Sequence, residues 1–184
     1  MKLTLSGKPG SGKSVVADIL AEKLNLKRYS VGNYRREMAK KRGMTLAEFN
    51  KLGEKEDFTD KEADEWQRQI GLNEDNFIID GRTGFLFIPD SIKIFLDVDE
   101  EMGAERSTKR HNVEEDTKTK EKALELQEER IASDIRRYKK YYNINPYDKK
   151  HYDLVIDTSN MNEKEVVERV LGFLNSYKTP HHKP

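Results

Sequence analysis

The sequence predicts an α/β domain built on a five-stranded parallel sheet with helices on both faces. Three observations support this fold class. Short apolar segments alternate with longer segments of helical periodicity along the chain, as a parallel sheet requires. The first apolar segment runs into a glycine-rich motif and then into a helix. At 184 residues, the chain has the length of one domain with a sizeable hydrophobic core.

The N-terminal part is expected to hold two strands and four helices. Alternating apolar and polar residues mark the strands, and apolar residues three or four positions apart mark the helices. Thr-x-x-Glu sequences, which cap helix N-termini, open the third and fourth helices at Thr45 and Thr59. In chain order the expected elements are strand 2–6, helix 15–24, strand 27–29, helix 32–42 ended by Gly43, a helix from 45, and a helix from 59 to about 70.

The C-terminal part continues the alternation with three strands, each of which ends in an acid or is followed by one. Residues 111–122 are polar and lack apolar periodicity, so we expect a mobile loop there. We expect one domain over residues 1–178 and a disordered tail over 179–184. The expected elements are strand 77–80, strand 92–96, helix 100–110, helix 122–142, strand 154–157 and helix 163–177.

Composition excludes several kinds of site. Lys plus Arg and Asp plus Glu number 34 each, so the formal net charge is zero and gives no bulk attraction to nucleic acid or to an anionic membrane. The chain has no cysteine, which excludes disulfides, thiolate metal sites and cysteine nucleophiles. No signal peptide or membrane span is recognisable. A soluble cytoplasmic protein is expected, with a monomer as the first interpretation and a dimer as the alternative.

The glycine-rich motif is Gly7-Lys8-Pro9-Gly10-Ser11-Gly12-Lys13-Ser14, a complete G-x-x-x-x-G-K-S phosphate-binding loop. Its glycines let successive backbone N–H groups converge on phosphate oxygens, and the N-terminus of the following helix adds positive potential. We expect Lys13 to reach the β- and γ-phosphates and the Ser14 hydroxyl to face a Mg²⁺ ion. The motif therefore predicts a site for a nucleoside triphosphate.

Further polar residues stand where the predicted strands end, which is where parallel sheets bind ligands. Asp80 ends the third strand, at the position where proteins with this loop place an acid to hold Mg²⁺. A turn-forming role before Gly81 is the alternative interpretation. Arg36 follows the second strand and Arg82 follows the third, so both guanidinium groups are candidates for the same end of the sheet.

Three residues of the helix at 122–142 share one face, namely Arg130, Asp134 and Arg137. Guanidinium groups so arranged hold phosphates by paired contacts, and a carboxylate between them accepts a hydrogen bond from a base amino group. The alternative interpretation is a solvated helix face stabilised by ion pairs between successive turns.

Taken together, these motifs resemble those of the nucleoside monophosphate kinases, and most of all the archaeal type of cytidylate kinase, over nearly the whole chain. The stretches that carry the resemblance are Ser30 to Arg36, Arg42 to Phe49, Ile79 to Arg82, Phe87 to Asp90, and Lys93 to Asp97. The resemblance implies a three-layer P-loop kinase fold with a helical monophosphate-binding region at about 30–72 and a mobile lid at about 106–130. It also implies Mg²⁺-dependent transfer of the γ-phosphoryl group of ATP to CMP and dCMP.

On the acceptor side, the resemblance implies roles for three residues. The segment that begins at Ser30 binds the monophosphate in this family, and the phosphate-binding arginine falls on Arg36, not on Arg35. In cytidylate kinases, the arginine that follows the glycine of the Gly81-Arg82 pair helps to read cytosine. The acceptor base is therefore expected beside the end of the third strand.

The resemblance also covers the lid. Arg106 falls where an arginine stacks on the donor adenine, and Arg110 falls where a second arginine contacts phosphates. Arg130 and Arg137 correspond to arginines that hold phosphates, and Asp134 to an aspartate that contacts cytosine. The expected catalytic residues are thus Lys13, Arg110, Arg130 and Arg137, the expected metal ligands are Ser14 and Asp80, and the expected donor contacts are residues 7–14 and Arg106.

Asp60, Asp64 and Gln67 resemble an archaeal D-x-x-x-D-x-x-Q pattern and share one helix face, but no role is assigned to them. An exposed polar face is the alternative interpretation. The chain departs from the archaeal pattern in carrying Ser14 where threonine is common and Asp80 where glutamate is common. Both changes keep the hydroxyl or the carboxylate, so the predicted chemistry is unaffected.

Two other functions stay open at this point. A P-loop kinase for a small metabolite, such as a sugar or a shikimate-like acid, shares the loop and the sheet but does not need Arg82 with Asp134 to recognise a base. An ATPase or ATP-switched interaction protein is the other alternative, with the charged segment around Asp116 as a partner surface. His181 and His182 suggest a metal site less strongly than a disordered tail. The sequence does not decide between CMP, dCMP and UMP.

Overall fold

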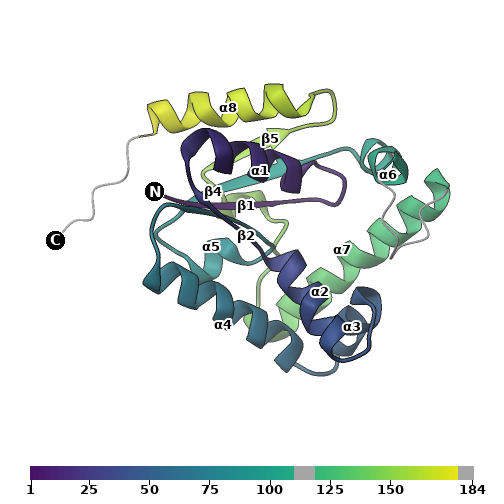
Figure 1. The fold of residues 1–184 in the computed structure, drawn as a ribbon. Coiled ribbons are helices and arrows are strands. Elements are labelled where there is room, and N and C mark those ends of the chain that lie inside the picture. The colour runs from purple at the N-terminus through teal and green to yellow at the C-terminus, as the bar shows by residue number, and fades with distance from the viewer. Residues whose placement is uncertain (110–118, 178–184) are drawn as a thin grey trace.

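The structure is a computed structural model that describes residues 1–109 and 119–177 (Figure 1). Its sheet contains five parallel strands in the order β2-β3-β1-β4-β5, which confirms the predicted sheet and its three-layer arrangement. The strands are β1 (Lys2–Gly7), β2 (Lys27–Ser30), β3 (Phe77–Asp80), β4 (Ile92–Asp97) and β5 (Leu154–Asp157). Of the mobile loop predicted at 111–122, residues 111–118 lie outside the described residues, and residues 120–122 are wrongly predicted because they form the first turn of α7. Arg110 and the tail predicted at 179–184 also lie outside the described residues.

Helices α1 (Lys13–Leu24) and α8 (Glu163–Ser176) cover one face of the sheet (Figure 1). Apolar side chains of the central strands, such as Leu5 and Ile94, pack there against Leu20 of α1 and Val170 of α8, and all four are essentially inaccessible to solvent. This layer holds α1 firmly behind the glycine-rich motif, so the N-terminus of the helix points at whatever the loop binds.

The opposite face carries the helical region expected at 30–72, which comprises α2 (Val31–Lys41), α3 (Leu46–Gly53) and α4 (Phe58–Asn73). Thr45 forms the predicted capping box with Glu48 at the start of α3. The second predicted cap is wrong, because α4 begins at Phe58 and Thr59 is buried inside it. The Thr59 hydroxyl donates to the Glu56 carbonyl at 3.3 Å instead of accepting from the first turn.

Two helices run side by side at one end of the molecule, α6 (Glu100–Lys109) and α7 (Lys120–Tyr142) (Figure 1). Helix α7 starts two residues earlier than expected because the Thr119 side chain caps it, accepting from Lys122 N at 3.2 Å. From there α7 continues beneath the sheet to α3, so it reaches from α6 to the helical region that comprises α2, α3 and α4.

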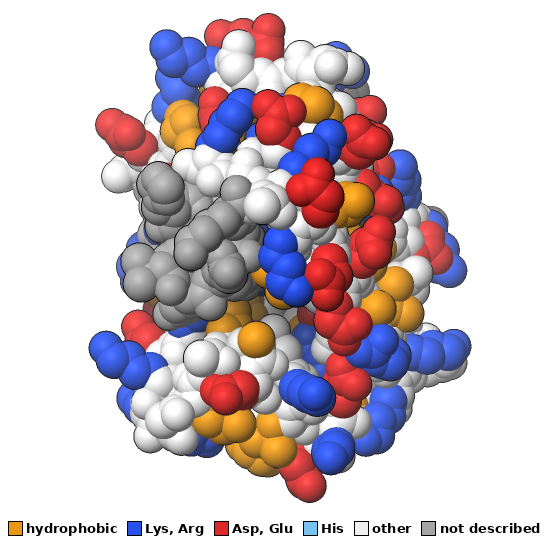
Figure 2. Space-filling view, turned by 90° about the vertical axis from the view of Figure 1, so that its right-hand side faces the viewer, with side chains coloured by type: hydrophobic (Ala, Val, Ile, Leu, Met, Phe, Trp, Pro, Cys, Tyr) orange, Lys and Arg blue, Asp and Glu red, His pale blue; other side chains and the backbone are white. Residues whose placement is uncertain are grey.

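Two short elements were not expected from the sequence, α5 (Gly84–Phe87) and a 3₁₀ turn at Lys149–His151. Phe85 of α5 stacks on His151 of the turn, with 4.4 Å between ring centroids. Next to them, Phe95 of β4 packs against Tyr152, with 4.8 Å between ring centroids. Within the described ranges no helix is long and apolar enough to cross a membrane. Acidic and basic side chains are interspersed on the face shown in Figure 2.

Candidate functional site

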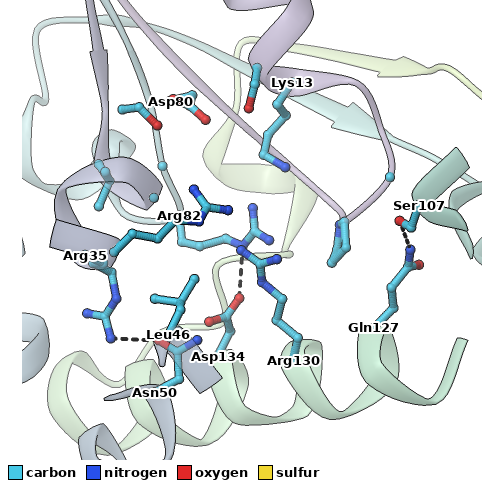
Figure 3. A pocket seen from close by; sticks show the side chains of 18 of the residues that line it. Lys13, Arg35, Leu46, Asn50, Asp80, Arg82, Ser107, Gln127, Arg130 and Asp134 are labelled. Carbon is cyan, nitrogen blue, oxygen red and sulfur yellow. Dashed lines mark hydrogen bonds and ion pairs between the residues drawn. The ribbon is translucent and has the colours of Figure 1, made fainter. Parts of the chain in front are cut away.

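A pocket at the carboxyl ends of the strands brings together segments that are far apart in the sequence (Figure 3). Its walls come from the glycine-rich loop, the starts of α2 and α3, the turn after β3, and one face of α7. Thirteen residues predicted for the site line it: Pro9, Gly10, Gly12, Lys13, Ser14, Ser30, Arg36, Asp80, Arg82, Arg106, Arg130, Asp134 and Arg137. Gly7, Lys8 and Ser11 belong to the loop but do not line the pocket, and Arg110 lies outside the described residues.

The loop requires glycine for two different reasons. Gly10 has a φ of 75°, and a Cβ atom placed on it would stand only 2.3 Å from the carbonyl oxygen of Gly103 in α6. Gly12 has a φ of 85°, but a Cβ atom there would meet nothing within 4 Å. Since the left-handed backbone at Gly12 opens onto free space at the helix N-terminus, the loop leaves room for an anion at this point.

Lys8 and Ser11 stabilise the loop from behind. The Lys8 ammonium forms an ion pair with Asp97 at the end of β4 at 3.2 Å. The Lys8 carbonyl accepts from the Ser11 hydroxyl at 2.8 Å and from the Lys13 ammonium at 3.2 Å. These contacts fix the loop shape, which is why the two side chains face away from the pocket.

The pocket is strongly cationic around Lys13. Burial, and after it the charge of Arg82, lower the pKa of Lys13 well below its ordinary value, and Arg130 acts in the same direction. Asp80 and Asp134 oppose this effect without cancelling it. A polyanion bound between these groups would relieve their mutual repulsion, so the electrostatics favour a phosphate chain at this place.

Asp80 and Ser14 supply oxygen atoms at the edge of the same pocket. The Asp80 carboxylate is largely buried and its Oδ1 accepts from Arg28 of β2 at 2.8 Å, while Ser14 is exposed at the start of α1. Within residues 1–109 and 119–177, no three acidic or histidine side chains gather into a metal cage. Proteins commonly hold Mg²⁺ through one or two oxygen ligands together with substrate phosphates, so Ser14 and Asp80 stay the predicted ligands.

Asp134 lies at the centre of a cluster of charged groups on α7. Its Oδ2 accepts from Arg82 Nε at 2.9 Å and from the Tyr147 hydroxyl at 2.7 Å, while its Oδ1 accepts from Arg137. Burial alone would raise the pKa of Asp134, but the charges of Arg82, Arg137 and Arg130 outweigh it and hold this pKa far below the usual range. Asp134 is therefore an ionised, acceptor-only group, and the alternative of a solvated helix face is wrong.

Arg82 links this cluster to the phosphate loop. Its NH1 donates to the Gly7 carbonyl at 2.7 Å, and its guanidinium lies over the Tyr147 ring at 5.5 Å. Tyr147 was not predicted for the site, since an isolated tyrosine in the segment between α7 and β5 carries no sequence signal. Together, Arg82 and Tyr147 connect the end of β1 to Asp134 of α7 by hydrogen bonds.

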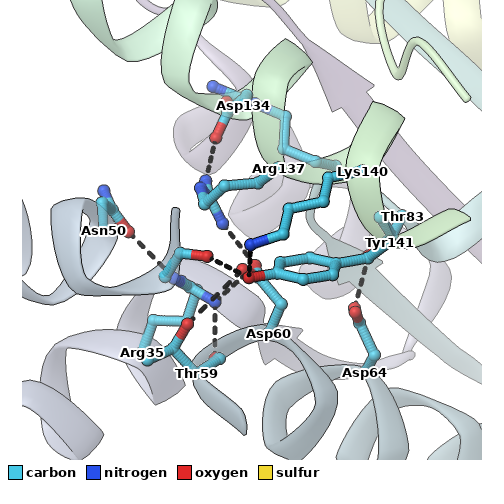
Figure 4. A network of polar contacts seen from close by, with 12 residues as sticks. Arg35, Asn50, Thr59, Asp60, Asp64, Thr83, Asp134, Arg137, Lys140 and Tyr141 are labelled. Atoms are coloured by element: carbon cyan, nitrogen blue, oxygen red, sulfur yellow. Dashed lines mark hydrogen bonds and ion pairs between the residues drawn. The ribbon is translucent and has the colours of Figure 1, made fainter. Parts of the chain in front are cut away.

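The helix face of Asp60, Asp64 and Gln67 is buried, so the interpretation of an exposed polar face is wrong. Asp60, which is only 1% exposed, accepts from Arg35 NH1 at 2.9 Å and from Arg137 NH1 (Figure 4). Arg35 also donates to the Thr59 carbonyl at 2.7 Å. Asp60 thus joins α2 and α4 to α7 directly behind the pocket.

Asp64 forms a second buried cluster one turn further along α4. It accepts from the Thr83 hydroxyl at 2.8 Å, from Gln67 Nε2 at 2.9 Å and from the Tyr142 hydroxyl at 2.7 Å. Burial is the largest influence on this carboxyl group and raises its pKa from 3.8 to about 6, although the hydroxyl donors act in the opposite direction. The Asp64 carboxyl group is therefore expected to change its protonation state at about pH 6.

This pKa predicts a pH-dependent stability. The folded state binds the Asp64 proton more tightly than the unfolded state, so the resulting stabilisation is complete below about pH 3.8 and is lost as the pH rises through about 6. Relative to Asp64→Asn, the free energy of unfolding of the wild type should fall by about 2 kcal/mol between about pH 4.5 and about pH 7.5. Urea titrations at both pH values measure this change, and a difference between the two proteins that stays constant with pH would contradict it.

Arg35 and Arg36 follow β2 but have different environments. Both line the pocket, but Arg35 is buried and bound to Asp60, whereas Arg36 is half-buried and donates to Asn33 Oδ1 at 3.0 Å. Ser30 caps α2 by accepting from Asn33 N at 3.4 Å. Arg35 is thus held in a buried ion pair, and the choice of Arg36 as the phosphate-binding arginine stays a prediction.

Arg106 is held by the loop between β5 and α8. Its guanidinium donates to the carbonyls of Thr158 at 2.7 Å, Ser159 at 3.1 Å and Met161 at 3.2 Å. It lines both the main pocket and a second hollow, which is bounded by Gly10, Gly12, Asn160 and Met161. Arg106 therefore lies where the main pocket and this second hollow meet, beside the phosphate loop.

Comparison with known proteins gives concordant results. The cytidylate kinase-like family matches residues 2–160. The chain is 37% identical over 183 residues to the cytidylate kinase of Methanocaldococcus jannaschii, covering 97% of this chain and 99% of that protein. It is 38% identical over 177 residues to the cytidylate kinase of Sulfurisphaera tokodaii, covering 95% and 96%.

Solved structures with the same fold include shikimate kinases. The enzyme of Bacteroides thetaiotaomicron gives a TM-score of 0.65 at 16% identity, covering 95% of this chain and 98% of that one. The enzyme of Aquifex aeolicus gives a TM-score of 0.60 at 22% identity, covering 96% and 97%. At such identities the likeness concerns the fold alone, and it confirms the predicted P-loop kinase architecture.

Proposed function

Because this chain belongs to the cytidylate kinase-like family, we propose that it is a nucleoside monophosphate kinase that transfers the γ-phosphoryl group of ATP to CMP, and also to dCMP. The observation that carries the proposal is the shared pocket, in which the phosphate loop faces the Asp134–Arg82 pair. The products are ADP and CDP or dCDP. A monomer in the cytoplasm belongs to this proposal, and the absence of cysteine from the chain suits a reducing compartment.

On the donor side, the backbone of the loop and Lys13 bind the triphosphate. The N–H groups at the start of α1 point into the pocket, and the cations around Lys13 favour a polyanion. Arg106, held in place by three carbonyls, offers a flat guanidinium face beside the second hollow, where the adenine ring lies in this proposal. Ser14 and Asp80 would hold Mg²⁺, which supplies positive charge to the phosphate oxygens.

On the acceptor side, Arg36 orients the phosphate of CMP, and Arg130 and Arg137 contribute further positive charge. Asp134 discriminates between bases because it stays ionised and accepts hydrogen bonds only. The 4-amino group of cytosine donates to such a carboxylate, whereas the 4-carbonyl of uracil is repelled by it. CMP is therefore the preferred acceptor over UMP.

Transfer itself depends on position and charge. The two nucleotides must lie in line, and the charge on the moving phosphoryl group must be neutralised away from water. Lys13, Arg130 and Arg137 provide fixed positive groups around the point where the two substrates meet. Arg110 belongs to the same proposal as a contact to the phosphates.

An assay with ATP, Mg²⁺ and a panel of acceptors tests this function. CMP, dCMP, UMP, AMP and GMP are each supplied as the acceptor, and ADP formation is followed by a coupled reaction. We expect CMP and dCMP to give the highest kcat/KM. A preference for AMP would refute the cytosine site, and activity with shikimate but with none of the nucleotides would refute the nucleotide acceptor altogether.

Replacing Arg36 by alanine should impair the use of the acceptor. Loss of a charged hydrogen bond to phosphate predicts a rise of roughly 10–100-fold in the KM for CMP, with the KM for ATP within about twofold of the wild type. Steady-state kinetics with each substrate varied in turn measure this split. Arg169→Ala, an exposed change on α8, is the matched control and should leave both KM values unchanged. Wild-type use of CMP by the Arg36 variant would refute the role.

A further inference from the structure

Helix α3 contributes one wall of the pocket, although no function assigned so far involves it. Leu46, from its first turn, and Asn50, one turn later, both line the pocket next to α7, beside Asp134 (Figure 3). Leu46 and Val31 present apolar surface to this part of the pocket, as a planar base requires for its ring faces. Asn50 of α3 adds a polar side chain to this apolar part of the pocket.

The orientation of the Asn50 amide follows from its partner. Arg35 NH2 lies 3.0 Å from Asn50 Oδ1. A guanidinium group carries donors and no acceptor, so the amide atom that faces it must be the oxygen. Within residues 1–109 and 119–177, the Asn50 NH2 group donates no hydrogen bond to another protein group. Asn50 therefore offers a hydrogen-bond donor to a ligand.

Asn50 and Asp134 are the two ends of one continuous set of hydrogen bonds (Figure 4). In order, the set runs Asn50, Arg35, Asp60, Arg137 and Asp134, with Asp60 accepting from both arginines. Arg35, Asp60 and Arg137 are buried. They therefore hold the side chains of Asn50 and Asp134 in fixed orientations. The pocket thus holds a fixed acceptor, Asp134, on one wall and a fixed donor, Asn50, on another.

This pairing matches the edge of cytosine. That edge carries an amino donor at position 4 and acceptors at N3 and at the 2-carbonyl oxygen. With Asp134 at the amino end of the base, the acceptor end of the base is left for Asn50 of α3. We propose, on the basis of the function proposed above, that Asn50 is a specificity-determining residue that donates its amide N–H to the 2-carbonyl oxygen of the pyrimidine acceptor. Adenine also has ring-nitrogen acceptors beside its amino group, but it has no carbonyl oxygen at the place of the pyrimidine 2-carbonyl.

Asn50→Asp is the most selective test, because the aspartate keeps an oxygen for Arg35 at nearly the same size and replaces the amide donor by a negatively charged acceptor. We expect kcat/KM for CMP to fall at least about tenfold, mostly through KM, with the KM for ATP unchanged. Inhibition by ribose 5-phosphate, which carries the sugar and phosphate without a base, should stay at the wild-type level. Asn73→Asp, the same chemical change at an exposed position on α4, should alter none of these values.

The outcomes separate the inference from the function on which it rests. A wild-type protein that does not use CMP would overturn both. A wild-type protein that uses CMP, with an Asn50→Asp variant of unchanged kcat/KM, would overturn only the role of Asn50. Equal weakening of CMP and ribose 5-phosphate would also overturn it, by indicating a contact to sugar or phosphate. If Asn50→Asp does not fold, Asn50→Ala takes its place, with the same selective loss for CMP expected.

Discussion

Lys13→Met should abolish phosphoryl transfer without destabilising the protein. In the proposed function the Lys13 ammonium group is the positive charge next to the phosphates, and removing one such group from a preorganised site lowers kcat by roughly 10²–10³-fold or more. The same ammonium is unfavourable in the free protein, because burial and the nearby Arg82 lower its pKa well below the ordinary value. Methionine has a similar length and no charge, so it removes this unfavourable buried charge from the folded protein.

Two measurements on the same variant check this prediction. A coupled assay with ATP and CMP should give a kcat reduced by at least about 10²-fold, while thermal unfolding without nucleotide should show a Tm equal to or above that of the wild type. Lys23→Met, an exposed change in the last turn of the same helix, is the matched control and should leave both values unchanged. Near-wild-type turnover in Lys13→Met would refute the role of Lys13, and a large fall in its Tm would refute the electrostatic account.

Asp60→Ala should cause the largest loss of stability among the variants considered. Arg35 and Arg137 share the Asp60 carboxylate, and Arg137 is only 2% exposed. Removing one partner of a buried ion pair leaves uncompensated charge and costs about 3–5 kcal/mol. Since Arg137 then loses its position beside the pocket, the KM for CMP should rise as well.

Urea denaturation and steady-state kinetics measure the two effects of Asp60. Asp57→Asn, which removes a solvent-accessible ion pair with Lys61 at the start of the same helix, should change the free energy of unfolding by no more than about 1 kcal/mol. Asp60→Asn keeps the hydrogen-bond acceptor and should lie between the wild type and the alanine variant. A loss for Asp60→Ala no larger than that of Asp57→Asn would show that the cluster contributes little.

The parts of the structure that were predictable are those with local signals. Apolar periodicity located all five strands, and the glycine-lysine motif located the loop, because both depend on neighbouring residues. The Thr59 cap failed for the same reason, since a Thr-x-x-Glu pattern does not reveal that tertiary burial draws the threonine inside α4.

The polar clusters could not be derived from spacing alone, because their members are distant in the sequence. Asp60 lies 77 residues from Arg137, and Arg82 lies 52 residues from Asp134. Only the fold brings these pairs together, so a buried, hydrogen-bonded α4 face and an exposed polar one have the same sequence pattern. The family resemblance singled out Asp134 and Arg82, while Tyr147 and Asn50 required the structure.

In the proposed function, the phosphoryl group that leaves ATP is transferred to CMP within one pocket. Quantifying both products in a reaction with ATP, Mg²⁺ and CMP as the sole acceptor measures this transfer. We expect one CDP for each ADP, with little ADP formed when CMP is omitted. ADP formed at the same rate with or without CMP, and without CDP, would refute the transfer.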